Sequence, residues 1–291
     1  MNNSQVIIFG EVLFDCFPDG NVVLGGAPFN VAWHLQAFGV SPLFISRIGN
    51  DIYGETIQKA MADWGMNLSG LQYDQFYPTG IVQVKFIDNE PSYDIVENSA
   101  YDFIDFSMLP NLAENSILYH GTLALRNSIS AKTLEKIKTD ISPSIFLDVN
   151  LRSPWWNSNV IKSLLKQTSS LKLNEEELSL LITEKKDINE AINYLFSTYP
   201  LNNITLTKGK AGAIAFTRDG ISKQISPSQN IAVIDTVGAG DAFCSVLILG
   251  MLKNWDISTT LTKAQEFASA IVERQGATTN DKSFYASFLK E

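Results

Sequence analysis

Short apolar runs alternate along this chain with segments in which apolar residues recur at helical spacing, and this alternation constrains the fold most strongly. Because parallel strands need a crossover connection, it predicts an α/β fold with a largely parallel sheet covered by helices on both faces. The 291 residues can bury one large core, and we interpret residues 1–291 as a single domain. Strands are expected at residues 6–9, 42–48, 116–119, 144–149, 171–173 and 203–207, and helices at residues 55–64, 132–139, 175–182, 242–252 and 261–273.

Two segments, at about residues 12–24 and 78–105, depart from this rhythm. Residues 81–86 and 93–96 are typical of two strands, joined by the turn residues 88–91, and no helix follows them. We expect this hairpin to form a small separate sheet with the first segment.

The composition restricts the possible partners. The formal net charge is −9, and nucleic-acid binding normally needs a basic face, so we expect no nucleic-acid partner. No apolar run is long enough to span a bilayer, and residues 1–5 do not resemble a signal peptide, so we expect no membrane contact. Cys16 and Cys244 are interpreted as buried free thiols of a cytoplasmic protein. With His34 and His120 as the only histidines, a His-rich metal site or a serine–histidine hydrolase has little material.

The stretch 231–243 carries the most chemistry. Residues 231–234 predict a short buried strand, and the apolar segment 242–252 predicts a buried helix. Between them, Gly238 and Gly240 allow a tight backbone turn, and the free N–H groups at a helix start favour an anion such as phosphate. A carboxylate beside an anion cradle is unfavourable unless it takes a proton from the attacking group, which Asp241 would do. The alternative interpretation is a glycine turn with Asp241 as the N-cap.

Other polar residues follow expected strands or open expected helices. Ligands bind beyond the carboxyl ends of the strands in an open α/β sheet, where Asp148, Asn150 and Arg152 are expected. Structural interpretations remain open for four of these stretches. Asp15 can be a solvated turn acid, Gly25 and Gly26 an ordinary glycine loop before a helix, and Arg152 part of a salt-bridged loop. Asn174 can simply cap the next helix, where Glu177 and its neighbouring glutamates suit the helix dipole.

Several of these motifs resemble one family. Residues 235–243, Asp-Thr-Val-Gly-Ala-Gly-Asp-Ala-Phe, are similar to the C-terminal signature of the ribokinase-like (PfkB-type) sugar kinases. Residues 25–39 resemble the N-terminal signature of that family, and residues 49–54 resemble its Gly-x-Asp-x-x-Gly turn. Residues 93–104 and 121–126 are similar to the fructokinase branch. The resemblance covers nearly the full length and implies a ribokinase-like fold with a β lid over the sugar.

The resemblance implies an ATP-dependent sugar kinase, most similar to fructokinase, that uses Mg²⁺ with ATP as co-substrate, and it includes K⁺ as a candidate monovalent cation. It also implies a homodimer formed through the lid. Asp241 would be the catalytic base, and Gly238, Ala239 and Gly240 would form the anion hole. The implied sugar-binding residues are Asp15, Gly25, Gly26, Asn30 and Arg152; the nucleotide-binding residues are Asn174, Thr207, Gly209 and Gly212; Glu177 would act on Mg²⁺ through water; and Asp235 and Val237 would lie at a monovalent cation.

Three alternatives remain open from the sequence. The first is a kinase for 2-keto-3-deoxygluconate or another sugar. The second is a non-catalytic sugar- or nucleotide-binding protein on the same fold, against which the intact residues 238–241 argue. The third is an NAD-dependent dehydrogenase, but the chain lacks Gly-x-Gly-x-x-Gly after its first strand, and residues 207–213 are not a Walker A loop.

Overall fold

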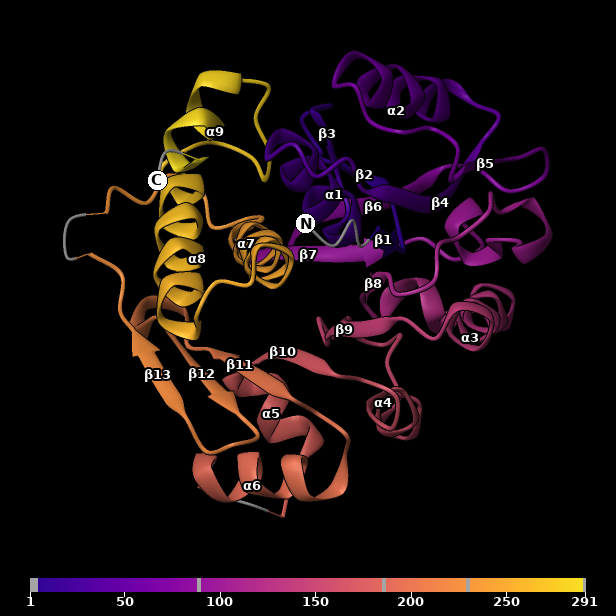
Figure 1. Ribbon diagram of the computed structural model, residues 1–291. Helices are drawn as coiled ribbons and strands as arrows, with labels where there is room; N and C mark the ends of the chain where they lie inside the picture. The colour runs from indigo at the N-terminus through magenta and orange to yellow at the C-terminus, as the bar shows by residue number, and fades with distance from the viewer. Residues whose placement is uncertain (1–4, 88–89, 185–186, 229–230, 290–291) are drawn as a thin grey trace.

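A nine-stranded sheet forms the centre of the computed structural model, which describes residues 5–87, 90–184, 187–228 and 231–289 (Figure 1). The strand order is β13-β12-β11-β10-β9-β8-β1-β4-β5, and the strands from β11 to β5 are parallel, whereas β12 and β13 are antiparallel. The predicted α/β fold class is therefore confirmed. The strands are β1 (Val6–Phe9), β4 (Leu43–Gly49), β5 (Leu71–Asp74), β8 (Ile117–His120), β9 (Ser144–Asp148), β10 (Ser170–Asn174), β11 (Asn203–Thr207), β12 (Ala213–Thr217) and β13 (Ser222–Ile225).

Helices cover both faces of this sheet because its strands alternate their apolar side chains between two cores. Val6 and Ile8 point into one core, and Ile7 and Phe9 point into the other. The first core is covered by α1 (Ala27–Ala37), α2 (Ile52–Asp63), α7 (Ala239–Lys253), α8 (Ile257–Val272) and α9 (Lys282–Leu289). The second core is covered by α3 (Ser128–Ile141), α4 (Ser158–Leu165), α5 (Glu175–Leu181) and α6 (Ile188–Thr198) (Figure 1).

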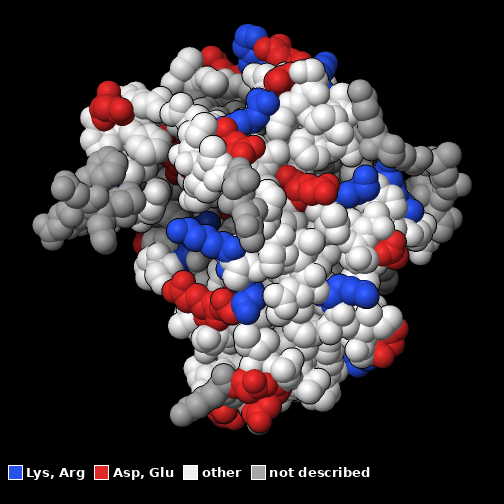
Figure 2. Space-filling view, turned by 90° about the vertical axis from the view of Figure 1, so that its left-hand side faces the viewer, with Lys and Arg blue, Asp and Glu red and all other residues white. Residues whose placement is uncertain are grey.

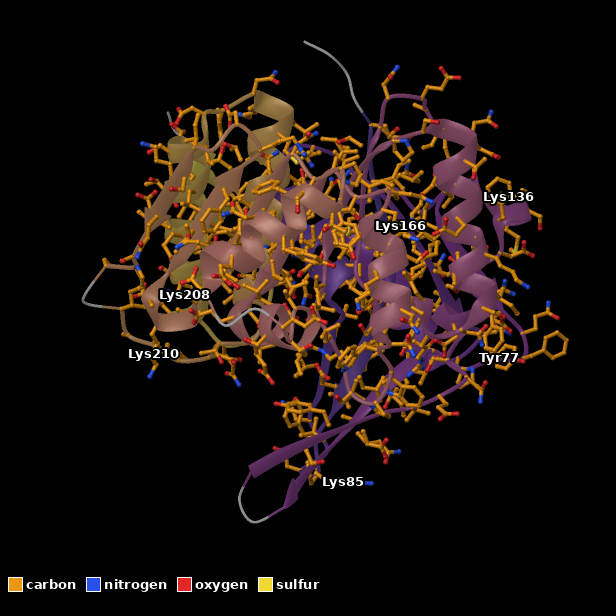
Figure 3. All side chains as sticks on the ribbon, turned by 90° about the horizontal axis from the view of Figure 1, so that it is seen from below. Tyr77, Lys85, Lys136, Lys166, Lys208 and Lys210 are labelled. Atoms are coloured by element: carbon orange, nitrogen blue, oxygen red, sulfur yellow. The ribbon has the colours of Figure 1, made fainter. Side chains whose placement is uncertain are left out.

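The four strands outside this rhythm form a sheet of their own, in the order β3-β2-β6-β7. One face is buried: Val82 and Ile95 pack with Leu13 and Tyr101, and Val84 is buried as well. Figure 3 shows the β6–β7 hairpin projecting from the main body and carrying Lys85. The expected turn at residues 88–91 lies partly outside the described residues. The strands are β2 (Leu13–Cys16), β3 (Val22–Gly25), β6 (Gly80–Ile87) and β7 (Glu90–Ile95).

The predicted buried strand at residues 231–234 is wrong. These residues are irregular, and Val233 and Ile234 are exposed. The reason is that the backbone N–H groups of Ile234 and Asp235 donate to the Val272 carbonyl at the end of α8 (2.8 and 3.2 Å) rather than to a strand. The helix that follows begins at Ala239, with Gly238 as its N-cap, so Asp241 lies in the first turn and is not the N-cap.

The two cysteines differ in exposure. Cys244 on α7 is buried, as predicted, but Cys16 on the small sheet is only half-buried, so its predicted burial is wrong. The Cys16 thiol lies 3.9 Å from the Tyr53 hydroxyl at the margin of the first core, against which both residues pack. Among the described residues, no helix combines the length and the apolar character that a bilayer crossing requires.

Candidate active site

The start of α7 forms the centre of the candidate site. Gly238 has φ +78°, and a Cβ there would lie 2.5 Å from Cα of Ala277, so the turn needs glycine. The first bond of the helix runs from the Ala242 N–H to the Gly238 carbonyl (2.8 Å). The N–H groups of Gly240 and Asp241 find no acceptor within the described part of the chain, as expected for a first helical turn. This turn can therefore bind an anion.

Asp241 lies where α1 and α7 meet. The Asn30 side chain donates from Nδ2 to Oδ2 of Asp241 at 2.8 Å, across 211 positions of sequence. Burial raises the pKa of Asp241 to about 6, and the negative charge of Asp148 also raises it. The Asn30 hydrogen bond and the positive charges of Lys172 and Arg152 lower this pKa. A carboxylate with a pKa just below neutrality can accept a proton at pH 7, which suits a general base.

The candidate sugar residues lie beside this turn. Oδ2 of Asp15 on β2 lies 3.5 Å from where a Gly25 Cβ would be, and burial raises the pKa of Asp15. Gly26 is the N-cap of α1 with φ +110°, and a Cβ there would lie 2.8 Å from the Glu11 carbonyl. Asn30 is buried, and the described residues offer its Oδ1 no donor, so an acceptor remains for a hydroxyl group.

Arg152 follows β9 in a loop and is exposed. Its guanidinium is close enough to lower the pKa of Asp15 and of Asp241, which places positive charge on the open side of the site. The structure therefore brings Arg152 to the group of candidates through its charge.

Glu11, which directly follows β1 and Gly10, was not predicted as a site residue. It is 4% exposed, no donor reaches its Oε2 from the part of the chain that the structure describes, and burial raises its pKa to about 7. Arg152 lowers this pKa and Asp241 raises it, so the Glu11 carboxyl is close to both. The sequence signal was an acid immediately after a buried strand, at the edge of the sheet where ligands bind.

Replacing Glu11 by Gln should flatten the pH dependence of stability. A raised pKa means that the folded state holds the proton more tightly, so the wild type loses stability as pH rises from about 4.5 through about 7. From the size of the shift, the free energy of unfolding of Glu11→Gln should exceed that of the wild type by about 3 kcal/mol above pH 7. Below pH 4.5 the two proteins should be equally stable. Urea unfolding at a series of pH values measures this. The exposed Glu114→Gln serves as the control, and parallel curves for wild type and Glu11→Gln would contradict the prediction.

The candidate nucleotide residues follow β10 and β11. Asn174 and Thr207 are cross-strand neighbours at the carboxyl ends of these strands. The Asn174 side chain caps α5 by accepting from the Glu177 N–H (2.8 Å), as the structural alternative predicted. Gly209 (φ +52°) lies in open space, whereas Gly212 (φ +90°) packs tightly on the Ile225 carbonyl. Both glycines belong to one loop beside the two strand ends, and Figure 3 shows Lys208 and Lys210 of this loop on the same side of the main body.

Both oxygens of Glu177 hold backbone groups. Oε1 accepts from the Leu151 N–H (2.9 Å) and Oε2 from the Asn174 N–H (2.8 Å), and the residue is 6% exposed. A carboxylate used in this way has lone pairs left for a water molecule but is not arranged for direct coordination. The part of the chain that the structure describes contains no group of three or more His, Cys, Asp or Glu side chains arranged to hold a metal ion.

Asp235 closes the loop in front of α7. Its Oδ1 accepts from the Val237 N–H (3.0 Å) and its Oδ2 from the Gly276 N–H (3.0 Å). The carboxylate therefore joins the segments before α7 and after α8.

Lys172 and Asp148 form a buried pair that was not predicted. The ammonium of Lys172 on β10 donates to both oxygens of Asp148 on β9, at 3.0 and 3.3 Å. The Lys172 Nζ also lies only 3.3 Å from where a Cβ on Gly240 would be. A lysine between Leu171 and Leu173 in a buried strand was the signal that could have revealed this pair.

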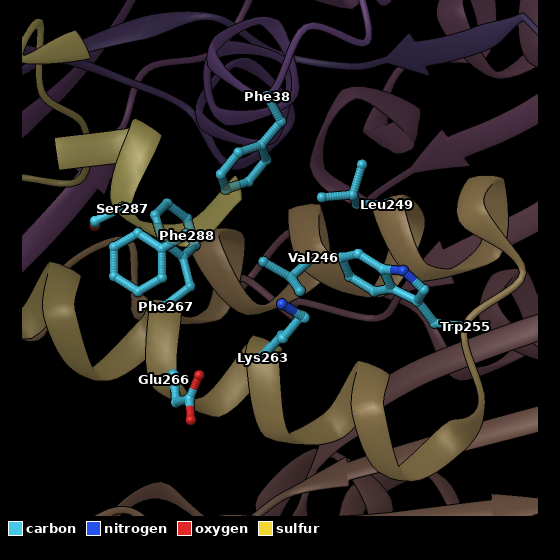
Figure 4. Close-up of a pocket in the computed structure, with 9 residues that line it drawn as sticks. All are labelled: Phe38, Val246, Leu249, Trp255, Lys263, Glu266, Phe267, Ser287 and Phe288. Carbon is cyan, nitrogen blue, oxygen red and sulfur yellow. The ribbon is translucent and has the colours of Figure 1, made fainter. Parts of the chain in front are cut away.

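A cavity along α7 and the surface charges lie outside the candidate site. A cavity of about 170 Å³ lies further along α7, with Val246, Trp255, Lys263 and Phe288 among its lining residues (Figure 4). Its largely aromatic and aliphatic lining offers few hydroxyl-binding groups, so it does not extend the candidate site. The face in Figure 2 carries both signs of charge in small scattered groups, so this face has no extended field of one sign.

Comparisons with known proteins show the family of the chain. Residues 16–283 match the pfkB family of carbohydrate kinases. A fructokinase of Klebsiella pneumoniae is 30% identical over 264 residues, which cover 86% of this chain and 85% of that protein. A fructokinase structure from Vibrio cholerae with fructose, ADP and calcium ion is 25% identical, with a TM-score of 0.83 and 99% coverage of both chains. A sugar kinase structure from Pyrococcus horikoshii with ATP is 26% identical, with a TM-score of 0.79 and 94% coverage of both chains.

Proposed function

We propose, from the premise that this chain belongs to the pfkB family of carbohydrate kinases, that it transfers the γ-phosphoryl group of ATP to a hydroxyl group of fructose. That the chain is an ATP-dependent sugar kinase follows from its family and from its fructokinase relatives. The proposal adds the sugar and the role of each residue. The observation that carries these roles is the contact of Asp241 with Asn30 beside the free N–H groups of the α7 turn.

In this proposal Asp241 accepts the proton of the attacking hydroxyl, and the N–H groups of residues 238–240 bind the transferred phosphoryl group. Asp15, Gly25, Gly26, Asn30 and Arg152 hold the sugar. The nucleotide lies along Asn174, Thr207, Gly209 and Gly212, at the carboxyl ends of β10 and β11. The support is that Asn174 and Thr207 are neighbours at the carboxyl ends of β10 and β11, where α/β folds bind ligands, and that Asn30 contacts Asp241.

Two cations belong to the proposal. Mg²⁺ keeps several of its waters when bound, which fits the remaining lone pairs of Glu177, and it would neutralise phosphate charge. A monovalent cation such as K⁺ would take backbone carbonyls of the loop that contains Asp235 and Val237. Asp235 holds that loop closed through the Val237 and Gly276 N–H groups.

The acidic surroundings favour a neutral sugar. Asp15, Glu11 and Asp241 are the carboxyl groups near the sugar candidates, and Arg152 is exposed. A sugar acid such as 2-keto-3-deoxygluconate would bring its carboxylate near those groups, which is unfavourable. The similarity to fructokinases supports fructose among the neutral sugars.

We expect D-fructose to be phosphorylated with a higher kcat/KM than ribose, adenosine or 2-keto-3-deoxygluconate. ADP release with each sugar at several concentrations measures this, with Asp241→Asn protein as the blank. Equal or higher kcat/KM with ribose would contradict fructose as the substrate and leave the kinase activity standing. Binding of sugar and ATP without turnover of any sugar would instead favour the non-catalytic alternative.

We also expect a homodimer formed through the small sheet. Its inner face is buried within the chain, and among the residues whose exposure the structure describes, Tyr93 (55% exposed) and Val22 (38%) are large apolar side chains open to a partner. Light scattering at micromolar concentration should give about twice the 32.2 kDa chain mass. Tyr93→Ser should shift the equilibrium toward monomer, and a wild-type monomer would contradict the prediction.

A further inference from the structure

We propose that Lys172 is a positioning residue for phosphoryl transfer, which holds the first turn of α7 and places a fixed positive charge behind its glycines. This inference rests on the proposed function. The Lys172 side chain is 9% exposed, and its Nζ lies 3.3 Å from the position of a Cβ on Gly240. The ammonium therefore lies directly against the turn whose N–H groups would bind the phosphoryl group.

A network of buried side chains fixes this ammonium. Asp148 accepts from Lys172 with both oxygens (3.0 and 3.3 Å), and its Oδ2 also accepts from the Tyr119 hydroxyl and the Cys244 thiol, both at 3.3 Å. Cys244 lies on α7 three residues after Asp241. The network thus joins β8, β9 and β10 to the first turns of α7.

The ammonium has hydrogen-bonding capacity to spare. It carries three N–H donors, and Asp148 is the acceptor that the described residues provide. Burial alone would lower the pKa of Lys172, but Asp148 more than reverses this, so Lys172 stays charged. A fixed charge beside the cradle stabilises negative charge that develops on the phosphoryl group without reorganisation of solvent.

A purely structural role explains the pair poorly. Replacing a buried ion pair by apolar residues is often neutral or stabilising, so a strand between Leu171 and Leu173 does not need one for stability. The buried Lys138 on α3 provides a comparison. Its partner Glu135 is half-exposed, and α3 packs in the second core, on the opposite face of the sheet from α7. Lys138 is therefore a matched control.

The charges around Asp241 come from several elements. Asn30 of α1 donates a hydrogen bond to it. The charges of Asp148 and Lys172 come from β9 and β10 of the main sheet, and those of Arg152 and Glu11 come from the loops after β9 and β1. Asp148 raises the pKa of Asp241, and Lys172 lowers it. Removing Lys172 alone should therefore raise this pKa, and removing the charge of Asp148 alone should lower it.

The test compares Lys172→Met, Asp148→Asn, the double variant and the control Lys138→Met. Lys172→Met and the double variant should lose roughly tenfold to a hundredfold in kcat, with a smaller change in the KM for ATP. The acid limb of the kcat profile should move to higher pH in Lys172→Met and to lower pH in Asp148→Asn. Lys138→Met should retain the wild-type kcat and the wild-type pH of the acid limb.

The double variant keeps the test decisive if Lys172→Met unfolds, because it leaves neither charge buried alone. A double variant that melts cooperatively and keeps kcat within about threefold of the wild type would overturn the proposal, since the residual difference would fall below any oxyanion-donor effect. Lower melting temperatures with unchanged kcat would also overturn it. A wild type that turns over no sugar would refute the proposed function instead, and the two failures are thus distinguished.

Discussion

Replacing Asp241 by Asn should lower kcat by roughly 10²–10⁴, the usual contribution of a positioned general base. The amide keeps the shape of the side chain and an oxygen that can accept from Asn30, but it cannot take a proton. Nucleotide affinity should change little because the N–H groups of the α7 turn remain. Steady-state kinetics with calorimetry of ATP binding and a melting curve measure the three quantities.

The matched control is Glu190→Gln. Glu190 is the third residue of α6, as Asp241 is the third residue of α7, but it is exposed. The control should keep the wild-type kcat. A near wild-type kcat in Asp241→Asn would remove Asp241 from the chemistry, and lost activity that accompanies unfolding would return it to a structural role.

The same carboxylate should set the acid limb of the wild-type rate profile. Because the base must be ionised, kcat should fall as pH drops below about 6, the pKa to which burial raises Asp241. Burial lowers the pKa of His34 and of His120 to about 3, so neither imidazole titrates in this range. Glu11→Gln should keep the acid limb at the wild-type pH, which would assign the limb to Asp241 and not to Glu11.

Replacing Gly238 by Ala should lower kcat/KM by about 10²-fold, because a shift of about 1 Å in a catalytic group has an effect of this size. The new methyl group would lie 2.4 Å from Cβ and 2.5 Å from Cα of Ala277, so the turn or the loop after α8 must move. The residue also keeps φ +78°, which disfavours alanine. Kinetics at saturating ATP and a melting curve measure the result.

Gly39→Ala isolates the backbone strain from the steric clash. Gly39 follows α1 with φ +77°, and a Cβ there would meet nothing within 4 Å. It should lose only about 1–2 kcal/mol of stability, the cost of a left-handed residue, and no activity. Equal kinetic losses in both variants, or none in Gly238→Ala, would show that close packing on Ala277 is not what positions the turn.

The fold was predictable where periodicity was strong. The parallel sheet and most of its helices followed from alternating apolar runs, since burial on both faces leaves that pattern. The strand predicted at residues 231–234 was wrong because an apolar residue is not always buried. The N–H groups of Ile234 and Asp235 bond to the end of α8 and not to a strand. The short strand β5 and the helices α4, α6 and α9 were not predicted.

The site was predictable in part. Turn chemistry and resemblance pointed to residues 238–241, and the structure places Asn30 against Asp241. Glu11 and Lys172 escaped because their meaning depends on neighbours distant in sequence: Glu11 on Asp241, and Lys172 on Asp148 and Gly240. A single charged residue at a strand does not reveal its partner.

The contact between Asn30 and Asp241 also bears on synthesis of the chain in the cell. The ribosome adds 211 residues between the two, which takes roughly 10–40 s at usual elongation rates. During that time α1 has emerged while α7, which packs against it in the same core, has not. Pairing over such sequence distances is slow, and the uncovered apolar surface is open to aggregation. A nascent chain that stalls before α7 should therefore depend on chaperones, and neither sugar nor ATP can rescue it, because the pocket that would bind them does not yet exist.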